Sequence, residues 1–227
     1  MKILAIDTAT DILGVALTED TDLMVECRLN LKRAHAEKLL VTVDKILNEA
    51  QIKLKELTAI AVSIGPGSFT GLRIGLAVVK GLAFAANLPV VAVPTLDALV
   101  LQARGYPFQI CPLIKAQADE AYFAFYHFER QKLIRDSDYQ LVDIKFFKEL
   151  ITQKNLILNV NVRSLYHFIA EDRTGLIEFA PPEMCKISGY TVAQIALQKL
   201  AANEVENIDL LEPFYLKNFK AKKKIGL

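Results

Sequence analysis

The sequence contains no tryptophan and only three cysteines, Cys27, Cys111 and Cys185, in 227 residues. Their odd number, their wide separation and the lack of a Cys-x-x-Cys pair argue against a disulfide framework, so we expect reduced thiols and a cytoplasmic protein. The N-terminus reaches Asp7 after a short apolar run, which is too short for the core of a signal peptide.

The sequence also lacks a large excess of either charge and lacks long apolar runs. The formal net charge is +1, so the isolated chain has no general field for polyanions and is not expected to bind RNA tightly by itself. The most apolar stretch, residues 70–86, is short and carries Arg73 and Lys80, which argues against a membrane span. Glycine is absent between Gly105 and Gly175.

The most informative stretch that is present runs from residue 58 to residue 87. An apolar strand is predicted to end at Gly65-Pro66-Gly67, and a helix apolar nearly all round follows over 70–86. Its small residues are Gly71, Gly75, Ala77, Gly81, Ala83 and Ala85. Since each glycine costs about 1 kcal/mol of helix propensity relative to alanine, we expect a second helix to pack closely there. The alternatives are a buried core helix and a phosphate site at the helix N-terminus.

The order of predicted elements indicates a duplicated α/β fold with a mixed sheet in each of two lobes, residues 1–105 and 106–227. The first half predicts strands at 3–6, 12–18, 23–29, 58–64 and 88–93, and helices at 33–50, 70–86 and 94–104. The second half predicts strands at 110–114, 121–128, 133–142, 156–160 and 176–179, and helices at 144–153, 163–171 and 190–203. At 52% apolar composition, the chain can bury a sizeable core.

Three motifs resemble those of the TsaB (YeaZ) family: GPGSFTGLRIG at 65–75, RAHAEKLL at 33–40 and EPFYL at 212–216. That family is the non-catalytic subunit of the bacterial complex that makes threonylcarbamoyladenosine in tRNA. The resemblance implies a two-lobed fold of the actin, Hsp70 and sugar-kinase superfamily. It also implies a scaffold for a TsaD-type catalytic paralogue, together with a TsaE-type ATPase, and a homodimer when alone. Contact with tRNA would be indirect, or weak through the lysine-rich tail at 217–224.

The resemblance places the partner interface on the helices 33–50 and 70–86. The residues expected there are His35, Glu37, Leu40, Phe69, Leu72, Arg73, Gly75, Leu76, Val79 and Lys80. Replacing Gly75 or Ala77 by a large charged residue should then abolish partner binding and leave a folded monomer.

A vestigial phosphate-binding turn is expected at Asp7, Thr8 and Thr10, where the superfamily places an acidic residue and hydroxyls; a simple Asx turn is the alternative. A second phosphate loop would need glycine, and the hairpin 115–120 has none. This hairpin also departs from the family, with Lys115-Ala116-Gln117 where Asp-Ala-Arg is usual.

Two other functions compete with the scaffold hypothesis: an autonomous ATP-dependent small-molecule kinase or ATPase, and a nucleotide-sensing regulator. No cofactor is expected in the isolated chain, and a nucleotide at the partner interface is left open.

No catalytic residue and no metal site are expected. A helical His-x-x-x-His pair would place both imidazoles on one face, but the residue four after His35 is Leu39. His127 and His167 stand alone. No Gly-x-Ser-x-Gly sequence surrounds Ser68, so a serine nucleophile is not predicted either.

Overall fold

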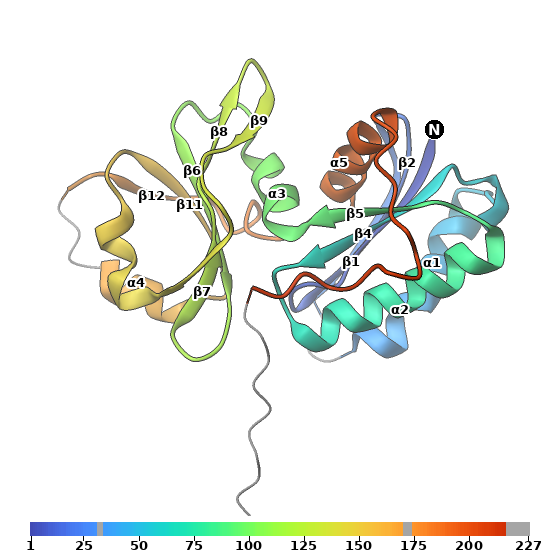
Figure 1. The fold of residues 1–227 in the computed structure, drawn as a ribbon, viewed down its shortest axis with the longest axis horizontal. Coiled ribbons are helices and arrows are strands. Elements are labelled where there is room, and N and C mark those ends of the chain that lie inside the picture. The colour runs from blue at the N-terminus through green and yellow to red at the C-terminus, as the bar shows by residue number, and fades with distance from the viewer. Residues whose placement is uncertain (31–33, 170–173, 217–227) are drawn as a thin grey trace, which may run out of the picture.

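The computed structural model describes residues 1–30, 34–169 and 174–216, which form two lobes, each built on a mixed sheet (Figure 1). The first sheet has the order β3-β2-β1-β4-β5. Its strands are β1 (Lys2–Asp7), β2 (Ile12–Glu19), β3 (Asp22–Asn30), β4 (Ala59–Gly65) and β5 (Val90–Pro94). β1, β2 and β3 pair antiparallel, whereas β1, β4 and β5 pair parallel. The central strands are nearly continuous apolar runs because both of their faces are covered.

The second sheet repeats this pattern, which confirms the duplicated α/β fold. Its order is β10-β7-β6-β11-β12, with β6 (Gln109–Lys115), β7 (Glu120–Phe123), β10 (Gln140–Asp143), β11 (Asn155–Val160) and β12 (Ile177–Phe179). β6 takes the place of β1, pairing antiparallel with β7 and parallel with β11. The strands β8 (Tyr126–Glu129) and β9 (Lys132–Arg135) form a hairpin attached to β6.

Two strands predicted in the second half are each broken in two. The expected strand 121–128 divides into β7 and β8, and the expected strand 133–142 divides into β9 and β10. The break coincides with bonds to the segment that follows β9: the Phe125 N–H donates to the Ser137 hydroxyl, and its carbonyl accepts from the Asp136 N–H. These backbone groups are therefore satisfied next to the β8–β9 hairpin rather than by continuing the pairing of β7. The helix expected over 144–153 is the 3₁₀ helix η3 (Ile144–Leu150).

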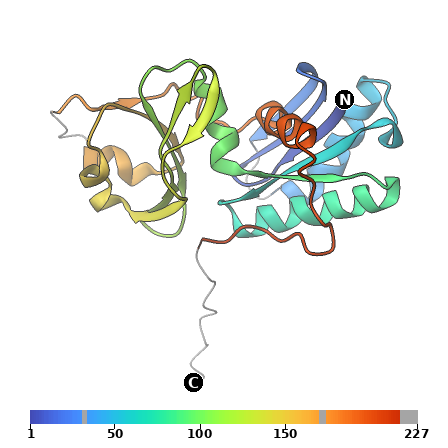
Figure 2. The same ribbon diagram turned by 45° about the horizontal axis from the view of Figure 1, so that its top comes forward.

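The helices form layers on both sheets (Figures 1 and 2). They are α1 (His35–Glu49), α2 (Phe69–Ala86), α3 (Thr95–Val100), α4 (Arg163–Ile169) and α5 (Gly189–Ala201), with the 3₁₀ turns η1 (Leu54–Glu56) and η2 (Leu101–Ala103). α1 and α2 lie on one face of the first sheet, while η3 and α4 cover the outer face of the second. Arg33, where the first helix was expected to begin, lies outside the described residues.

The last helix, α5, returns to the first lobe. It packs on the face of β1 and β2 opposite α1 and α2, where Val192 and Ala196 join Ile3 and Ala5 in one core. Gly189 permits this approach, since a Cβ there would lie 2.8 Å from the Ala16 backbone nitrogen. Residue 105 thus separates the two sheets, but the chain after residue 106 contributes to both lobes.

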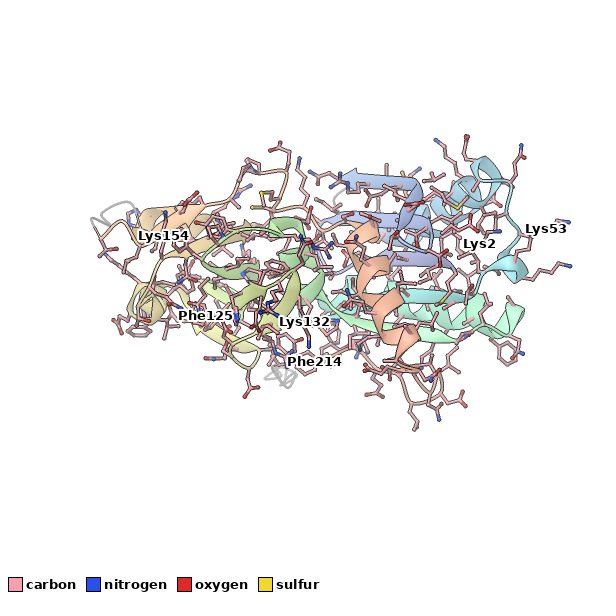
Figure 3. The ribbon with its side chains drawn as sticks, turned by 90° about the horizontal axis from the view of Figure 1, so that it is seen from above. Lys2, Lys53, Phe125, Lys132, Lys154 and Phe214 are labelled. Atoms are coloured by element: carbon pink, nitrogen blue, oxygen red, sulfur yellow. The ribbon has the colours of Figure 1, made fainter. Side chains whose placement is uncertain are left out.

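The segment that follows α5, residues 206–216, is called the strap. Its Glu206 N–H donates to the Val90 carbonyl, and its Phe214 N–H donates to the Ile64 carbonyl, at 2.9 and 2.8 Å. Phe214 lies at the junction of the lobes (Figure 3) and packs on Tyr139 of the second lobe with ring centroids 5.5 Å apart. The strap therefore links both lobes.

Candidate interaction surface and interlobe cleft

The glycines of GPGSFTGLRIG pack against the chain's own first turn. A Cβ at Gly71 would collide with the Thr8 carbonyl oxygen, and one at Gly75 would collide with the Thr8 hydroxyl oxygen. Gly67 is similarly pressed against the Ala9 carbonyl. The expectation that these glycines admit a second helix is therefore wrong for Gly71 and Gly75: they let α2 lie directly on the turn between β1 and β2.

This packing closes the expected phosphate-binding turn. Asp7 and Thr8 are fully buried, and burial raises the pKa of Asp7 to about 6, against smaller opposing effects of the Ser63 hydroxyl and the Ala9 N–H. The Ala9 N–H donates to Asp7 Oδ1 at 3.3 Å, as in an Asx turn. Thr10, the third expected residue, lines a cavity between the lobes.

The expected interface residues divide into two groups. Leu72, Gly75, Leu76 and Val79 are buried beneath α2, and His35 is only 8% exposed at the start of α1. Phe69 and Lys80 are half-buried, whereas Glu37, Leu40 and Arg73 are exposed. The buried group therefore belongs mainly to the interior of the lobe.

The neighbouring helices α1 and α2 present an apolar outer surface, here called the docking face. It consists of Glu37, Leu40, Val41, Arg73, Ala77, Gly81 and Phe84, all exposed. Phe84 is 87% exposed, and Val41 and Leu40 are 64% and 52% exposed. The sequence prediction included Ala77 and Gly81 among the small residues open to a second helix, but it did not include Val41 and Phe84. Helical spacing from Arg73 to Ala77, Gly81 and Phe84 could have located the outer stripe.

Arg73 joins the N-terminal end of α2 to the strap. Its guanidinium lies 3.8 Å from the centroid of the Phe69 ring, and its Nε donates to the Tyr215 hydroxyl at 3.0 Å. The Phe69 and Tyr215 rings are 5.2 Å apart. This contact gives the C-terminal EPFYL motif a structural role, because it orders one end of the docking face.

By length and composition, α2 is apolar enough to cross a membrane, but a third of it is buried inside the protein. Leu72, Val79 and Ala83 belong to the packed interior of the first lobe. Together with the contact to Thr8, this burial identifies α2 as a structural layer of the lobe.

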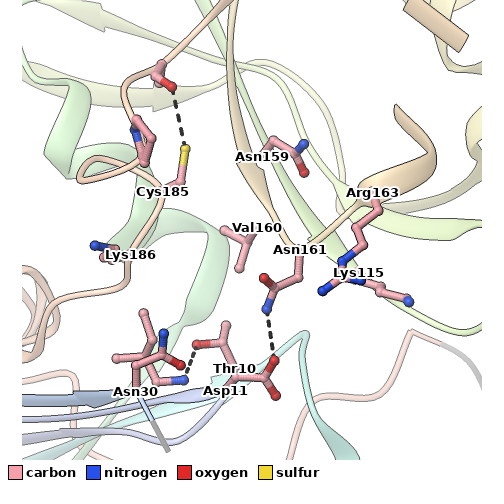
Figure 4. Close-up of a pocket in the computed structure, with 13 residues that line it drawn as sticks. Thr10, Asp11, Asn30, Lys115, Asn159, Val160, Asn161, Arg163, Cys185 and Lys186 are labelled. Carbon is pink, nitrogen blue, oxygen red and sulfur yellow. Dashed lines mark hydrogen bonds between the residues drawn. The ribbon is translucent and has the colours of Figure 1, made fainter. Parts of the chain in front are cut away.

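The second candidate functional site is a cavity of about 550 Å³ between the lobes, here called the interlobe cleft (Figure 4). The first lobe contributes the turn into β2, and the second contributes Lys115, Arg163 and Lys186. The hairpin after Lys115 is closed by a bond from the Ala116 N–H to the Glu120 carbonyl, with Ala118 rather than glycine at φ 46°. Within the described ranges, no three His, Cys, Asp or Glu side chains are grouped as metal ligands would be.

Comparison with known proteins identifies relatives over most of the chain. The family model described as TsaD, tRNA N6-adenosine threonylcarbamoyltransferase, matches residues 29–155. The tRNA threonylcarbamoyladenosine biosynthesis protein TsaB of Escherichia coli (strain K12) is 30% identical over 232 residues, covering 99% of this chain and 98% of the relative. The protein of that name from Bacillus subtilis (strain 168) is 32% identical, covering 77% of each.

Comparison with solved structures indicates the same family as the sequence comparison. YeaZ from Pseudomonas aeruginosa superposes with a TM-score of 0.80 at 25% identity, over 95% of this chain and 99% of that one. The ethanolamine utilization protein EutJ from Carboxydothermus hydrogenoformans has a TM-score of 0.51 at 12% identity, over 86% of this chain and 89% of that one. The second likeness concerns the fold alone.

Proposed function

Since the chain belongs to the TsaB (YeaZ) family, we propose that it acts in the biosynthesis of tRNA threonylcarbamoyladenosine as a non-catalytic subunit. In this role it binds and activates a TsaD-type threonylcarbamoyltransferase. The observation that carries the proposal is the docking face, where Leu40, Val41 and Phe84 are all more than half exposed. Large apolar side chains left exposed on two neighbouring helices of a folded protein are typical of a contact surface.

The partner is proposed to be the catalytic paralogue because the TsaD family model covers both helices of the docking face. A related chain would present an equivalent helix pair, and two such pairs can pack as a four-helix arrangement. Ala77 and Gly81 lie between Arg73 and Phe84 on the exposed stripe of α2 and would let a partner helix approach closely. Without the paralogue, a second copy of this chain would cover the same face as a homodimer.

Two features support the absence of catalysis in this chain. Asp7 is fully buried, and the hairpin after Lys115 has no glycine to admit a phosphate to its backbone. A TsaE-type ATPase and tRNA would join through the assembled complex in the cytoplasm. The lysine-rich tail at 217–224 lies outside the described residues, and its weak contact with tRNA stays a prediction.

The test is Ala77→Glu, which places a charge on the docking face without touching the interior. We expect loss of both the homodimer and binding to the TsaD-type paralogue, measured by analytical ultracentrifugation and calorimetry. The matched control is Ala201→Glu, at an exposed alanine ending α5. Gly75 is unsuitable for this test because its replacement would clash with Thr8. Unaltered assembly by the folded Ala77→Glu protein, or hydrolysis of Mg-ATP by the isolated chain, would contradict the proposal.

A further inference from the structure

The strap is fastened to the first sheet near its two ends and stands away from it in between. It runs past β5 and then alongside α2 toward the junction of the lobes (Figures 1 and 2). Backbone bonds join it to Val90 near its start and to Ile64 near its end. Between them, the Leu211 N–H donates to the Asn207 carbonyl at 3.0 Å and closes a turn. The space beside this turn is a groove of about 630 Å³, here called the strap groove.

The strap groove has an apolar lining. Ile64 and Ala92 of the first sheet contribute to it, together with Leu211 and Phe214 of the strap. Leu210 also lines the groove, and it is 76% exposed. A large apolar side chain left open beside an apolar groove is typical of a contact surface.

The strap groove is also acidic. Residues 201–216 contain no lysine or arginine, but they contain the carboxylates Glu204, Glu206, Asp209 and Glu212. All four are exposed, and none forms an ion pair with another residue that the structure describes. Glu206 and Glu212 line the groove itself. Unpaired charge of one sign around an apolar groove favours an occupant of the opposite sign, here a cationic segment with apolar side chains.

The backbone at this edge of the sheet is protected against a further strand. β5 is the last strand of the first sheet, and the Ala92 carbonyl accepts from Lys199 Nζ at 2.9 Å. Pro94, at the end of β5, has no N–H to donate. Edge strands that carry lysine and proline in this way resist pairing with another strand. The occupant of the strap groove is therefore held by side chains rather than by a ladder of backbone bonds.

We propose that the strap groove binds residues 217–227 of the same chain, here called the tail, which lie outside the described residues. The tail has no acidic residue, and it offers Phe219 and Ile225 to the apolar lining. Its lysines are Lys217, Lys220, Lys222, Lys223 and Lys224. Five positive side chains thus meet the four carboxylates of the segment before them. Docked in this way, the tail is withheld from other polyanions, including tRNA.

The tail begins beside the groove and can reach all of it. Phe214 and Tyr215 line the groove just before the tail starts. Eleven extended residues span at most about 36–40 Å. The strap is itself eleven residues, 206–216, and its turn makes it shorter than that. A short tether also keeps the effective concentration of the tail at the groove in the millimolar range, so that individually weak contacts suffice.

This contact is separate from the proposed scaffold role. The strap groove lies at the edge of β5, whereas the docking face belongs to α1 and α2. Loss of assembly by Ala77→Glu would leave the tail docked, and failure of the tail to dock would leave partner assembly intact. The two proposals can therefore fail separately.

The test uses the full chain with one tryptophan as a reporter, because the natural sequence contains none. Leu210→Trp places it in the strap groove at an exposed position, without opening the interior. Quenching of its fluorescence by acrylamide then measures how far the tail covers the groove. If the tail is docked more than half of the time, replacing its five lysines by glutamine should raise the quenching constant about twofold or more. Glu206→Gln combined with Glu212→Gln should have the same effect.

The matched control is Glu49→Gln combined with Glu149→Gln, which removes two exposed carboxylates from α1 and η3 and should leave the quenching unchanged. Protection should also be lost in about 1 M NaCl, where the Debye length falls to about 3 Å. Four outcomes would overturn the proposal: no effect of replacing the lysines, no effect of replacing Glu206 and Glu212, an equal effect of the control, or protection that survives the salt. Protection that grows with protein concentration would assign the groove to the tail of a second copy and would overturn it too.

Discussion

Two glycines of one helix are expected to respond in opposite ways to alanine. A Cβ at Gly81 meets no atom within 4 Å, so Gly81→Ala should gain the helix propensity of alanine, about 1 kcal/mol. A Cβ at Gly71 would overlap sterically with the Thr8 carbonyl oxygen, a backbone atom that cannot rotate away. Overpacking of this kind costs typically 1–3 kcal/mol, so Gly71→Ala should lose about 2 kcal/mol in the free energy of unfolding despite its better propensity.

Urea unfolding at several protein concentrations measures both values and separates them from any change in dimerisation, because Gly81 lies on the docking face. A third variant sharpens the test. The clash at Gly75 is with the Thr8 hydroxyl, a side-chain atom, so Thr8→Ala should recover much of the loss in Gly75→Ala but none of the loss in Gly71→Ala. Equal stability of Gly71→Ala and Gly81→Ala would refute the packing of α2 on the first turn.

The remaining predictions concern two carboxylates, the buried Asp7 and the partly buried Asp97. Burial raises the pKa of Asp7 from 3.8 to about 6, so its stabilising contribution is present below pH 3.8 and is lost as the pH rises through 6. Asp7→Asn should therefore increase the free energy of unfolding at pH 7 by up to about 3 kcal/mol and flatten its dependence between these pH values; a decrease at pH 7 would contradict this. Asp97 accepts bonds from the Tyr126 and Tyr139 hydroxyls at 2.7 and 2.8 Å. Asp97→Ala leaves the buried Tyr126 hydroxyl without its acceptor and should cost about 1–3 kcal/mol in urea unfolding, whereas Asp97→Asn should cost less.

The order of elements could be predicted because most strands and helices carry their own local signals. The strand Ala59–Gly65 is apolar and ends at glycine, and the helix after it begins with Ser68, whose hydroxyl accepts from the Gly71 N–H. The break between β7 and β8 could not be predicted, because it depends on a bond from Phe125 to Ser137, twelve residues away. Apolar residues on both sides of that break read as one continuous strand.

The site was predicted less completely because its decisive contacts are distant in sequence. Small residues in α2 correctly indicated close packing, but the sequence does not say that Thr8 is the neighbour of Gly71 and Gly75. Buried and exposed small residues therefore looked alike, and Gly75 was assigned to the wrong surface. Lys115 was noted as a departure from the family pattern, yet its place in the interlobe cleft, beside Arg163 and across the cavity from Lys186, depends on how three segments of the chain meet.

The position of α5 has a consequence for synthesis on the ribosome. One face of the first sheet, with Ile3 and Ala5, is completed by residues of α5 such as Val192. The last strand of that sheet ends at Pro94, whereas α5 ends at Ala201. At about 5–20 residues per second, the nascent sheet waits on the order of 5–20 s for its covering helix. The emerging N-terminal half must therefore keep a wide apolar face from aggregating until α5 has been synthesised.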